Sequence, residues 1–274
     1  MSRLSYIIRK LDWLPLVNFR IGFPLTLRHY YYFGSIADQL EKGELTSAAS
    51  WDTLRLHHPR FVIYQNRDEW LGSFSKDKDG QDLAIKARAV DIVQWCRDNR
   101  INNLHSVGVG SAALEYFIKS EDPSIRLIAS DFNLEGVTRL KRVFTECDQI
   151  TLFNVLTDDW SKLQPQSGES AVLMYRVDTS FTDEQWRMIF TRMTLSNVRH
   201  IIYIPATIMS VQYLIFMMMR HVWSRIRGRK MTFTGYVRSG EVFPKLWLDK
   251  FCYQQLKLGG LPSYWLTKVK GNNK

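Results

Sequence analysis

Two glycines and one acid are spaced in a way that suits an adenosine-containing ligand. The glycines, Gly108 and Gly110, follow an apolar run that begins at Leu104, and the acid, Asp131, ends a second apolar run that begins at Ile125. Glycines let the backbone approach a ligand closely, and the N-terminus of a following helix offers free N–H groups. A carboxylate at the tip of the next strand can accept hydrogen bonds from ribose hydroxyls. Residues 104–131 are therefore predicted to form strand, glycine turn, helix and strand around such a ligand.

The spacing of this turn leaves two classes of cofactor open. Gly108, Gly110 and Ala113 also match the G-x-G-x-x-A dinucleotide fingerprint, with Asp131 at a suitable distance for a ribose contact. A nicotinamide enzyme usually opens with this unit and continues into a further catalytic domain. Here a long segment precedes the turn, and the chain ends in a predicted hairpin around Gly259–Gly260. That order favours a different α/β family.

The elements that position these residues alternate between strand and helix. Helical spacing of apolar residues predicts helices over 83–100, 134–147, 182–195 and 239–251, and a Thr-Asp-Glu start suits an N-cap for the third. Apolar runs predict strands at 104–107, 125–129, 150–154, 171–177 and 198–204, and a closing hairpin at 253–258 and 263–269. The predicted fold is α/β: a Rossmann-like, mostly parallel seven-stranded sheet with helices on both faces and a C-terminal antiparallel hairpin.

Residues 1–80 are predicted to be an N-terminal extension before a Rossmann-like domain of residues 81–274. A short helix is expected at 35–49, a loop-rich piece at 51–70 and a polar boundary turn at 76–80. Residues 1–32 mix isolated bases with large apolar side chains and carry a net charge of +4. This composition fits a membrane-contacting arm, or an arm or lid packed on the main domain.

The charge balance favours an anionic partner. The 274 residues include 37 Lys and Arg against 27 Asp and Glu, a net charge of +10. This suits a phosphate-bearing substrate or a membrane surface, while nucleic acid is less favoured because no RNA-binding module is recognisable. Cys96, Cys147 and Cys252 form no C-x-x-C pair, which predicts a reduced, cytoplasmic compartment. Asp12 and Pro15 interrupt any signal-peptide core, so secretion is not expected.

An apolar and basic insertion at 206–234 breaks the alternation of strands and helices. Residues 201–219 carry no charge and approach the length of a membrane span, but Pro205 divides them after the fifth strand. An amphipathic or core-packed helix is therefore expected at 208–219, followed by five bases and no acid in 220–230. Contact of residues 208–230 with an anionic membrane is the alternative to internal packing, and it would place the protein at the inner face of the membrane.

The order of these motifs resembles the class I S-adenosylmethionine-dependent methyltransferases over residues 83–269. In that family the glycine turn, here Ser106 to Ala112, passes beside the methionine part of the cofactor, and the acid that ends the second strand holds the ribose. The family often has an acid at the position of Ser106, so a weaker hold on the cofactor's amino group is expected. The resemblance implies S-adenosylmethionine as cofactor, with Phe132 near the adenine and Asn154 addressing its amino group. The implied cofactor-binding residues are Ser106, Gly108, Gly110, Ser111, Asp131, Phe132, Asn154 and Val155.

The end of the fourth strand, Tyr175 to Asp178, faces the reaction centre in that family. Methyl transfer from a sulfonium depends mainly on in-line placement of the nucleophile, and a hydroxyl acceptor benefits from a general base. Asp178 is the best-placed candidate for that base, or else a capping or loop carboxylate. Arg176 would bind an anionic acceptor or pair with an acid. No metal site is predicted, since the neighbouring His57 and His58 lack further ligands at suitable spacing.

Residues 235–239 are similar to the corresponding stretch of bacterial glycan-modifying methyltransferases. Tyr236 and Arg238 would then approach the acceptor, while the bases of 225–230 would either meet phosphate groups or form a solvated surface. The resulting hypothesis is a methyltransferase that O-methylates a sugar or a lipid-linked glycan. One alternative is a non-catalytic methyltransferase-like binding subunit, suggested by Ser106 in place of the family's usual acid. The other is an NAD(P)-dependent oxidoreductase.

Overall fold

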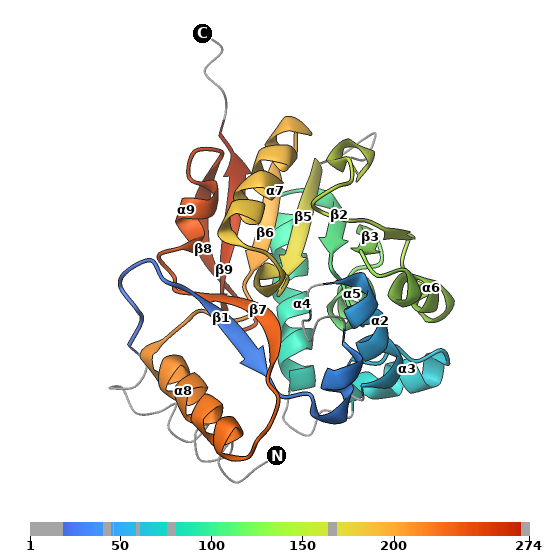
Figure 1. The fold of residues 1–274 in the computed structure, drawn as a ribbon. Helices are drawn as coiled ribbons and strands as arrows, with labels where there is room; N and C mark the ends of the chain where they lie inside the picture. The colour runs from blue at the N-terminus through green and yellow to red at the C-terminus, as the bar shows by residue number, and fades with distance from the viewer. Residues whose placement is uncertain are drawn as a thin grey trace.

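A seven-stranded sheet forms the centre of the computed structural model, which describes residues 19–40, 45, 47–58, 61–75, 81–163 and 169–269. The strand order is β4-β3-β2-β5-β6-β9-β8 (Figure 1). The first five of these strands are parallel: β2 (Ile101–Val107), β3 (Arg126–Asp131), β4 (Gln149–Leu152), β5 (Glu169–Tyr175) and β6 (His200–Ile204). The hairpin of β8 (Phe251–Leu258) and β9 (Leu261–Lys268) closes the sheet in antiparallel fashion. The predicted sheet and hairpin are confirmed.

Helices cover both faces of the sheet, because successive side chains of a strand point to opposite faces. Leu173 of β5 faces one core and Met174 faces the other. The first core lies under α4 (Gln81–Asp98), α5 (Ala113–Glu121) and α6 (Leu134–Val143), and the second lies under α7 (Asp183–Leu195) and α9 (Phe243–Trp247). The predicted N-cap of α7 is confirmed: Thr182 and Gln185 exchange side-chain to backbone hydrogen bonds of 3.2 and 2.9 Å.

A second, two-stranded sheet pairs β1 (Thr26–Tyr31) with β7 (Thr232–Arg238), which lie far apart in the sequence. Gly235 of β7 has a φ of 121°, and a Cβ there would lie 1.9 Å from the carbonyl oxygen of Thr179. Only glycine lets β7 pass this close to the 3-10 turn η5 (Asp178–Ser180). The stretch 235–239, predicted to precede a helix over 239–251, therefore lies largely in a strand, and the helix itself is only α9.

The N-terminal extension is more helical than predicted. A 3-10 helix η2 (Gly34–Gln39), α2 (Ala48–His57) and α3 (Arg67–Ser75) replace the expected helix at 35–49 and the loop-rich piece at 51–70. The Ser47 side chain caps α2 by accepting a 3.2 Å hydrogen bond from the backbone N–H of Ser50, and Leu54 anchors the helix in a buried cluster. The boundary turn at 76–80 and residues 1–18 of the predicted arm lie outside the described residues.

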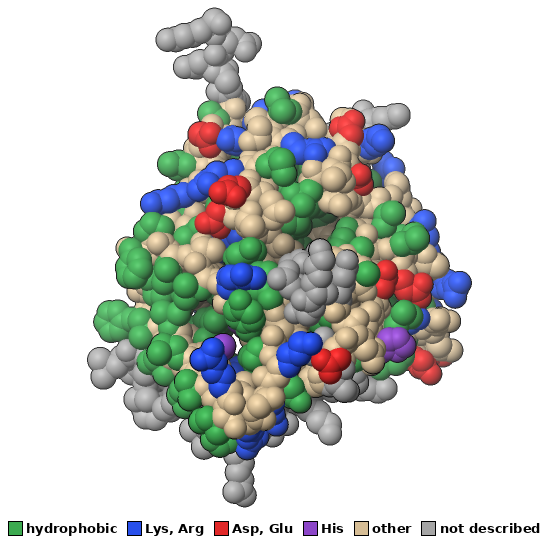
Figure 2. Space-filling model, viewed as in Figure 1, with side chains coloured by type: hydrophobic (Ala, Val, Ile, Leu, Met, Phe, Trp, Pro, Cys, Tyr) green, Lys and Arg blue, Asp and Glu red, His purple; other side chains and the backbone are tan. Residues whose placement is uncertain are grey.

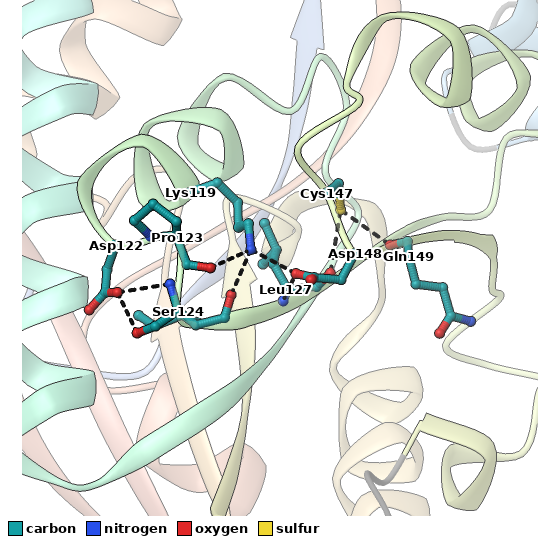
Figure 3. Close-up of polar contacts among 9 residues, drawn as sticks. Lys119, Asp122, Pro123, Ser124, Leu127, Cys147, Asp148 and Gln149 are labelled. Atoms are coloured by element: carbon teal, nitrogen blue, oxygen red, sulfur yellow. Dashed lines mark hydrogen bonds and ion pairs between the residues drawn. The ribbon is translucent and has the colours of Figure 1, made fainter.

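A buried lysine ties the end of α5 to the start of β3 (Figure 3). Lys119 Nζ donates to the carbonyl oxygens of Pro123 and Ile125 at 2.9 and 3.0 Å, and to Asp148 Oδ2 at 2.8 Å. The same carboxylate oxygen accepts a 2.8 Å hydrogen bond from Leu127 N in β3. This network fixes α5, whose first turn contributes to the cavity described below.

The uncharged run 201–219 is divided between β6 and α8 (Val211–Ile226), as the position of Pro205 predicted. Ser210 caps α8 by accepting a 3.2 Å hydrogen bond from Tyr213 N. The helix packs against the small sheet through Tyr213 and Leu214, which contact a cluster around Val237. No helix among the described residues combines the length and the apolar character that a membrane span requires.

Candidate functional site

A cavity of about 1770 Å³ opens at the carboxyl ends of the parallel strands. Its wall includes residues after β2, β3, β4 and β5, together with residues of β1, β7, α2 and α8. The strand order reverses between β2 and β5, and ligands of open α/β sheets bind at such a point. Most small-molecule sites occupy about 300–1000 Å³, so this cavity has room for a cofactor and an acceptor together.

The glycine turn after β2 lines one end of the cavity in a conformation that needs glycine. Gly108 has a φ of 68°, and a Cβ there would lie 2.4 Å from Cγ1 of Val177. The N-terminal extension supports the turn from outside, because Trp70 Nε1 donates a 2.9 Å hydrogen bond to the carbonyl oxygen of Ser111. Arg55 of α2 lies beside Gly110, whose added Cβ would be 2.9 Å from Nη2. The extension is thus part of the cavity wall.

Asp131 lies beside this turn and retains capacity for a ligand. Its Oδ2 accepts a 3.0 Å hydrogen bond from Gly110 N, and its Oδ1 accepts a 3.1 Å hydrogen bond from Asn133 N. Burial lowers the pKa of the nearby Arg55, and the attraction of Asp131 opposes that shift. A carboxylate can accept about four hydrogen bonds, so about two acceptor sites remain for ribose hydroxyls.

Glu115 supplies a carboxylate where the sequence pointed to a missing acid. Ser106 is fully buried behind the turn, and its Oγ donates a 2.6 Å hydrogen bond to Glu115 Oε1. Glu115 lies in the first turn of α5 and lines the cavity, although only 2% of it is exposed. Burial raises its pKa to about 7, the hydrogen bond from Ser106 opposes this shift, and Asp131 adds to it. Glu115 was not predicted from the sequence, although its place early in the helix after the glycine turn was an available signal.

The residues predicted to surround the adenine also line the cavity. Phe132, Asn154 and Val155 belong to its lining together with the residues of the glycine turn. The side-chain oxygen of Asn154 accepts a 3.0 Å hydrogen bond from Leu156 N, which holds the loop after β4 in shape. Seven of the eight predicted cofactor residues are therefore gathered on one cavity, and Ser106 stands behind it.

Asp178 lies behind the wall rather than in it. Its neighbours Val177 and Thr179 line the cavity, but Asp178 is only 1% exposed. Its Oδ1 accepts a 2.6 Å hydrogen bond from Ala206 N, while Oδ2 has no hydrogen-bond partner among the described residues. Burial raises the pKa of this carboxyl to about 6. This geometry matches the loop-carboxylate alternative better than a base that touches an acceptor.

The three predicted acceptor residues occupy different environments. Arg176 is exposed, lines the cavity and has a left-handed φ of 60°. Arg238 is fully buried: Nε donates to Asp183 Oδ1 at 2.7 Å, and Nη1 donates to the carbonyl oxygen of Asp178 at 2.6 Å. Tyr236 packs against Phe233, with ring centroids 5.4 Å apart. Neither Tyr236 nor Arg238 lines the described cavity, because β7 pairs with β1 and directs them elsewhere.

The part of the cavity formed by β1, α8 and the residues that follow each of them is basic and aromatic, and it is here called the basic end. Its lining includes arginines and aromatic side chains: Arg220, Arg227, Arg229, Tyr31, Phe33, Tyr213, Phe216 and Trp223. His29 also lines the cavity, and burial together with Arg220 lowers its pKa to about 4. Glu115 and Asp131, the acids of the described lining, lie beside the glycine turn, where Arg55 and Arg176 also line the cavity. The basic end therefore suits an anionic molecule with apolar parts.

Comparison with solved structures identifies the fold. No family model matches this chain, and no curated protein sequence matches it. Human N-acetylserotonin methyltransferase in complex with S-adenosylmethionine matches with a TM-score of 0.50 and 16% identity, over 86% of this chain and 66% of that chain. The fold is that of the S-adenosylmethionine-dependent methyltransferases. The methyltransferase SibL in its apo form matches with a TM-score of 0.50 and 12% identity, over 73% of this chain and 57% of that chain. This chain thus spans less than two thirds of the length of either protein.

Proposed function

We propose that this protein is an S-adenosylmethionine-dependent methyltransferase. The observation that carries the proposal is the pair of carboxylates, Asp131 and Glu115, on either side of a glycine turn in a methyltransferase fold. Asp131 would accept hydrogen bonds from the ribose hydroxyls, and Glu115 would pair with the cationic amino group of the methionine part. When bound, the cofactor supplies an activated methyl carbon, and the protein supplies binding and orientation.

The basic end of the cavity supports an anionic acceptor. Arg176 and Arg220 would fix its charged group, and the aromatic walls would cover its apolar part and exclude water. His29 lines the cavity, and burial together with Arg220 lowers its pKa to about 4, so its ring is neutral at pH 7 and would position the acceptor by a hydrogen bond rather than act as a strong base. The acceptor that best combines these properties is a phosphorylated sugar or a lipid-linked glycan, methylated on a hydroxyl.

Two observations weigh against the binding-subunit and oxidoreductase alternatives. A non-catalytic binding subunit was suggested by Ser106 in place of an acid, and Glu115 now provides a carboxylate at hydrogen-bond distance from that serine. An NAD(P)-dependent oxidoreductase fits the turn, but β9 runs antiparallel between β6 and β8, as in the methyltransferase fold.

Calorimetric titration separates these functions before any acceptor is known. We expect heat with S-adenosylmethionine and S-adenosylhomocysteine and none with NAD(P). Transfer of a labelled methyl group to a panel of phosphorylated glycans, lipids and RNA then tests catalysis. Heat with NAD(P) alone would favour the oxidoreductase, and cofactor binding without transfer to any member of the panel would favour the binding subunit.

A further inference from the structure

Helix α8 carries an exposed apolar stripe, here called the α8 stripe. Its seven members follow helical spacing, and each is between 38% and 72% exposed: Val211, Ile215, Met218, Met219, Val222, Trp223 and Ile226. Phe19 lies at the same end as Val211, whose N–H donates a 3.1 Å hydrogen bond to the Phe19 carbonyl, and is itself 62% exposed. Contiguous apolar patches of this kind mark interaction sites on soluble domains. Figure 2 shows hydrophobic side chains together with Lys and Arg over the lower left of the molecule, where Figure 1 places α8.

The charge around the α8 stripe is mostly basic, although Lys230 pairs with Asp38 of η2 at 3.1 Å. Residues 220–230 contain Arg220, Arg225, Arg227, Arg229 and Lys230, and no acid occurs anywhere from 201 to 240. A second copy of the chain packed on the stripe by two-fold symmetry would bring these bases together, and like charges in an interface are unfavourable. An anionic lipid surface complements both properties, because apolar side chains enter the acyl boundary while Arg and Lys meet phosphates.

The α8 stripe also borders the cavity. Met219 and Trp223 belong to the exposed stripe and line the cavity as well, and Phe216 and Arg227 extend the lining along the same helix. Arg227 lies with its guanidinium 4.4 Å from the centre of the Trp223 ring. A molecule anchored in a lipid surface beneath α8 would therefore reach the basic end of the cavity directly.

We infer that α8 is a membrane-contacting helix, which docks the basic end of the cavity on an anionic lipid surface and admits a membrane-anchored acceptor. The acceptor part of this inference rests on the proposed function, whereas the lipid contact does not. It explains why a helix beside the cavity exposes seven apolar side chains together with a run of bases.

The test is co-sedimentation of the full chain with vesicles of phosphatidylcholine, with and without phosphatidylglycerol. We expect binding only to the anionic vesicles, and weaker binding in high salt. Met218→Glu places a charge at a 68% exposed position outside the cavity lining and should weaken binding about tenfold or more. Leu195→Glu, at an 82% exposed position on α7, is the matched control and should bind like the wild type.

A second pair of variants tests the role of charge. Arg225→Glu should weaken vesicle binding several-fold, whereas Arg187→Glu, which makes the same charge change at an exposed site on α7, should not. Equal losses in both members of either pair would overturn the inference, as would indifference of the wild type to anionic vesicles. A dimer in light scattering that Met218→Glu dissociates, without vesicle binding, would assign the stripe to a second copy. If vesicle binding is lost on deleting residues 1–18 but kept in the α8 variants, the lipid contact would belong to residues 1–18 and not to α8.

Calorimetric titration with S-adenosylhomocysteine, run on the same proteins, keeps the two proposals apart. Heat of binding without vesicle contact would overturn the membrane inference alone. Vesicle contact without such heat would leave the lipid contact standing and contradict the proposed function.

Discussion

Glu115→Gln is the substitution that probes the cofactor site most sharply. Glutamine keeps the side-chain oxygen that accepts the 2.6 Å hydrogen bond from Ser106, but it cannot become negative. If Glu115 pairs with the amino group of the cofactor, the variant loses a charge-assisted hydrogen bond of about 1.5–3 kcal/mol, which weakens binding roughly tenfold to a hundredfold. Calorimetry with S-adenosylhomocysteine at pH 7.5 measures this loss.

The pH dependence of binding gives a second and independent readout. Because burial raises the pKa of Glu115 to about 7, the carboxyl is mostly protonated at pH 6. Its ionised fraction rises from about one tenth at pH 6 to about three quarters at pH 7.5, so the wild-type affinity should rise roughly eightfold over that range. The Glu115→Gln variant should show no such rise.

The same carboxyl makes a signed contribution to folding stability. Its pKa in the folded protein lies above the ordinary value of 4.5, so the folded protein favours the protonated carboxyl. The free energy of unfolding therefore falls as the pH rises from about 4.5 through about 7. Each pKa unit is worth about 1.4 kcal/mol, so the shift from 4.5 to about 7 makes Glu115→Gln more stable than the wild type by up to about 3.5 kcal/mol at pH 8, and the two proteins should be nearly equal near pH 4.5. Urea denaturation at the two pH values measures the difference.

Two further variants complete this test. Ser106→Asp combined with Glu115→Gln moves the acid to the position that the family commonly uses, and it should recover much of the lost affinity. Glu135→Gln, on α6 and outside the cavity lining, is the matched control. The reasoning is refuted if Glu115→Gln binds the cofactor like the wild type and keeps its pH dependence.

Three other substitutions test the surrounding framework. Asp131→Asn should weaken cofactor binding about a hundredfold in calorimetry, since hydrogen bonds to a charged acceptor are worth about 1.5–3 kcal/mol each; an unchanged affinity would remove the ribose assignment. Arg238→Met should lower the free energy of unfolding by about 3–5 kcal/mol, because it leaves buried polar partners unpaired; wild-type stability with a raised acceptor KM would instead restore the acceptor hypothesis. Lys119→Met should lower the free energy of unfolding by about 2–3 kcal/mol, because it leaves Asp148 and two carbonyl oxygens without their donor. Lys230→Met removes one partner of an exposed ion pair and should lower it by less than about 1 kcal/mol in the same denaturation assay.

The sheet could be predicted from the sequence because its signals are local. Each parallel strand is a short apolar run, and each following helix has its own apolar spacing and, in α7, its own cap at Thr182. The pairing of β1 with β7 has no such signal, because its register joins Thr26 to Arg238 across most of the chain. Helix α2 was predicted as loop because its residues mix polar and apolar types without a clear stripe, and packing around Leu54 stabilises it.

The candidate site was predictable where backbone geometry fixes it. Gly108, Gly110 and Asp131 lie where their motif places them, since the turn and the strand end leave little freedom. The position of Glu115 early in the helix after the glycine turn was a signal in the sequence, but its hydrogen bond with the buried Ser106 depends on where α5 lies relative to β2. Arg238 was expected beside the acceptor, and only the long-range pairing of β7 explains its burial.

The central claim, that this cavity binds S-adenosylmethionine through Asp131 and Glu115, is tested most directly by one calorimetric experiment. S-adenosylhomocysteine is titrated into the wild type and into Glu115→Gln at pH 6 and pH 7.5. We predict one site per chain, with a wild-type affinity that rises with pH and a variant that binds weakly at both values. Absence of heat in the wild type, or equal affinities of the two proteins at both pH values, would contradict the claim.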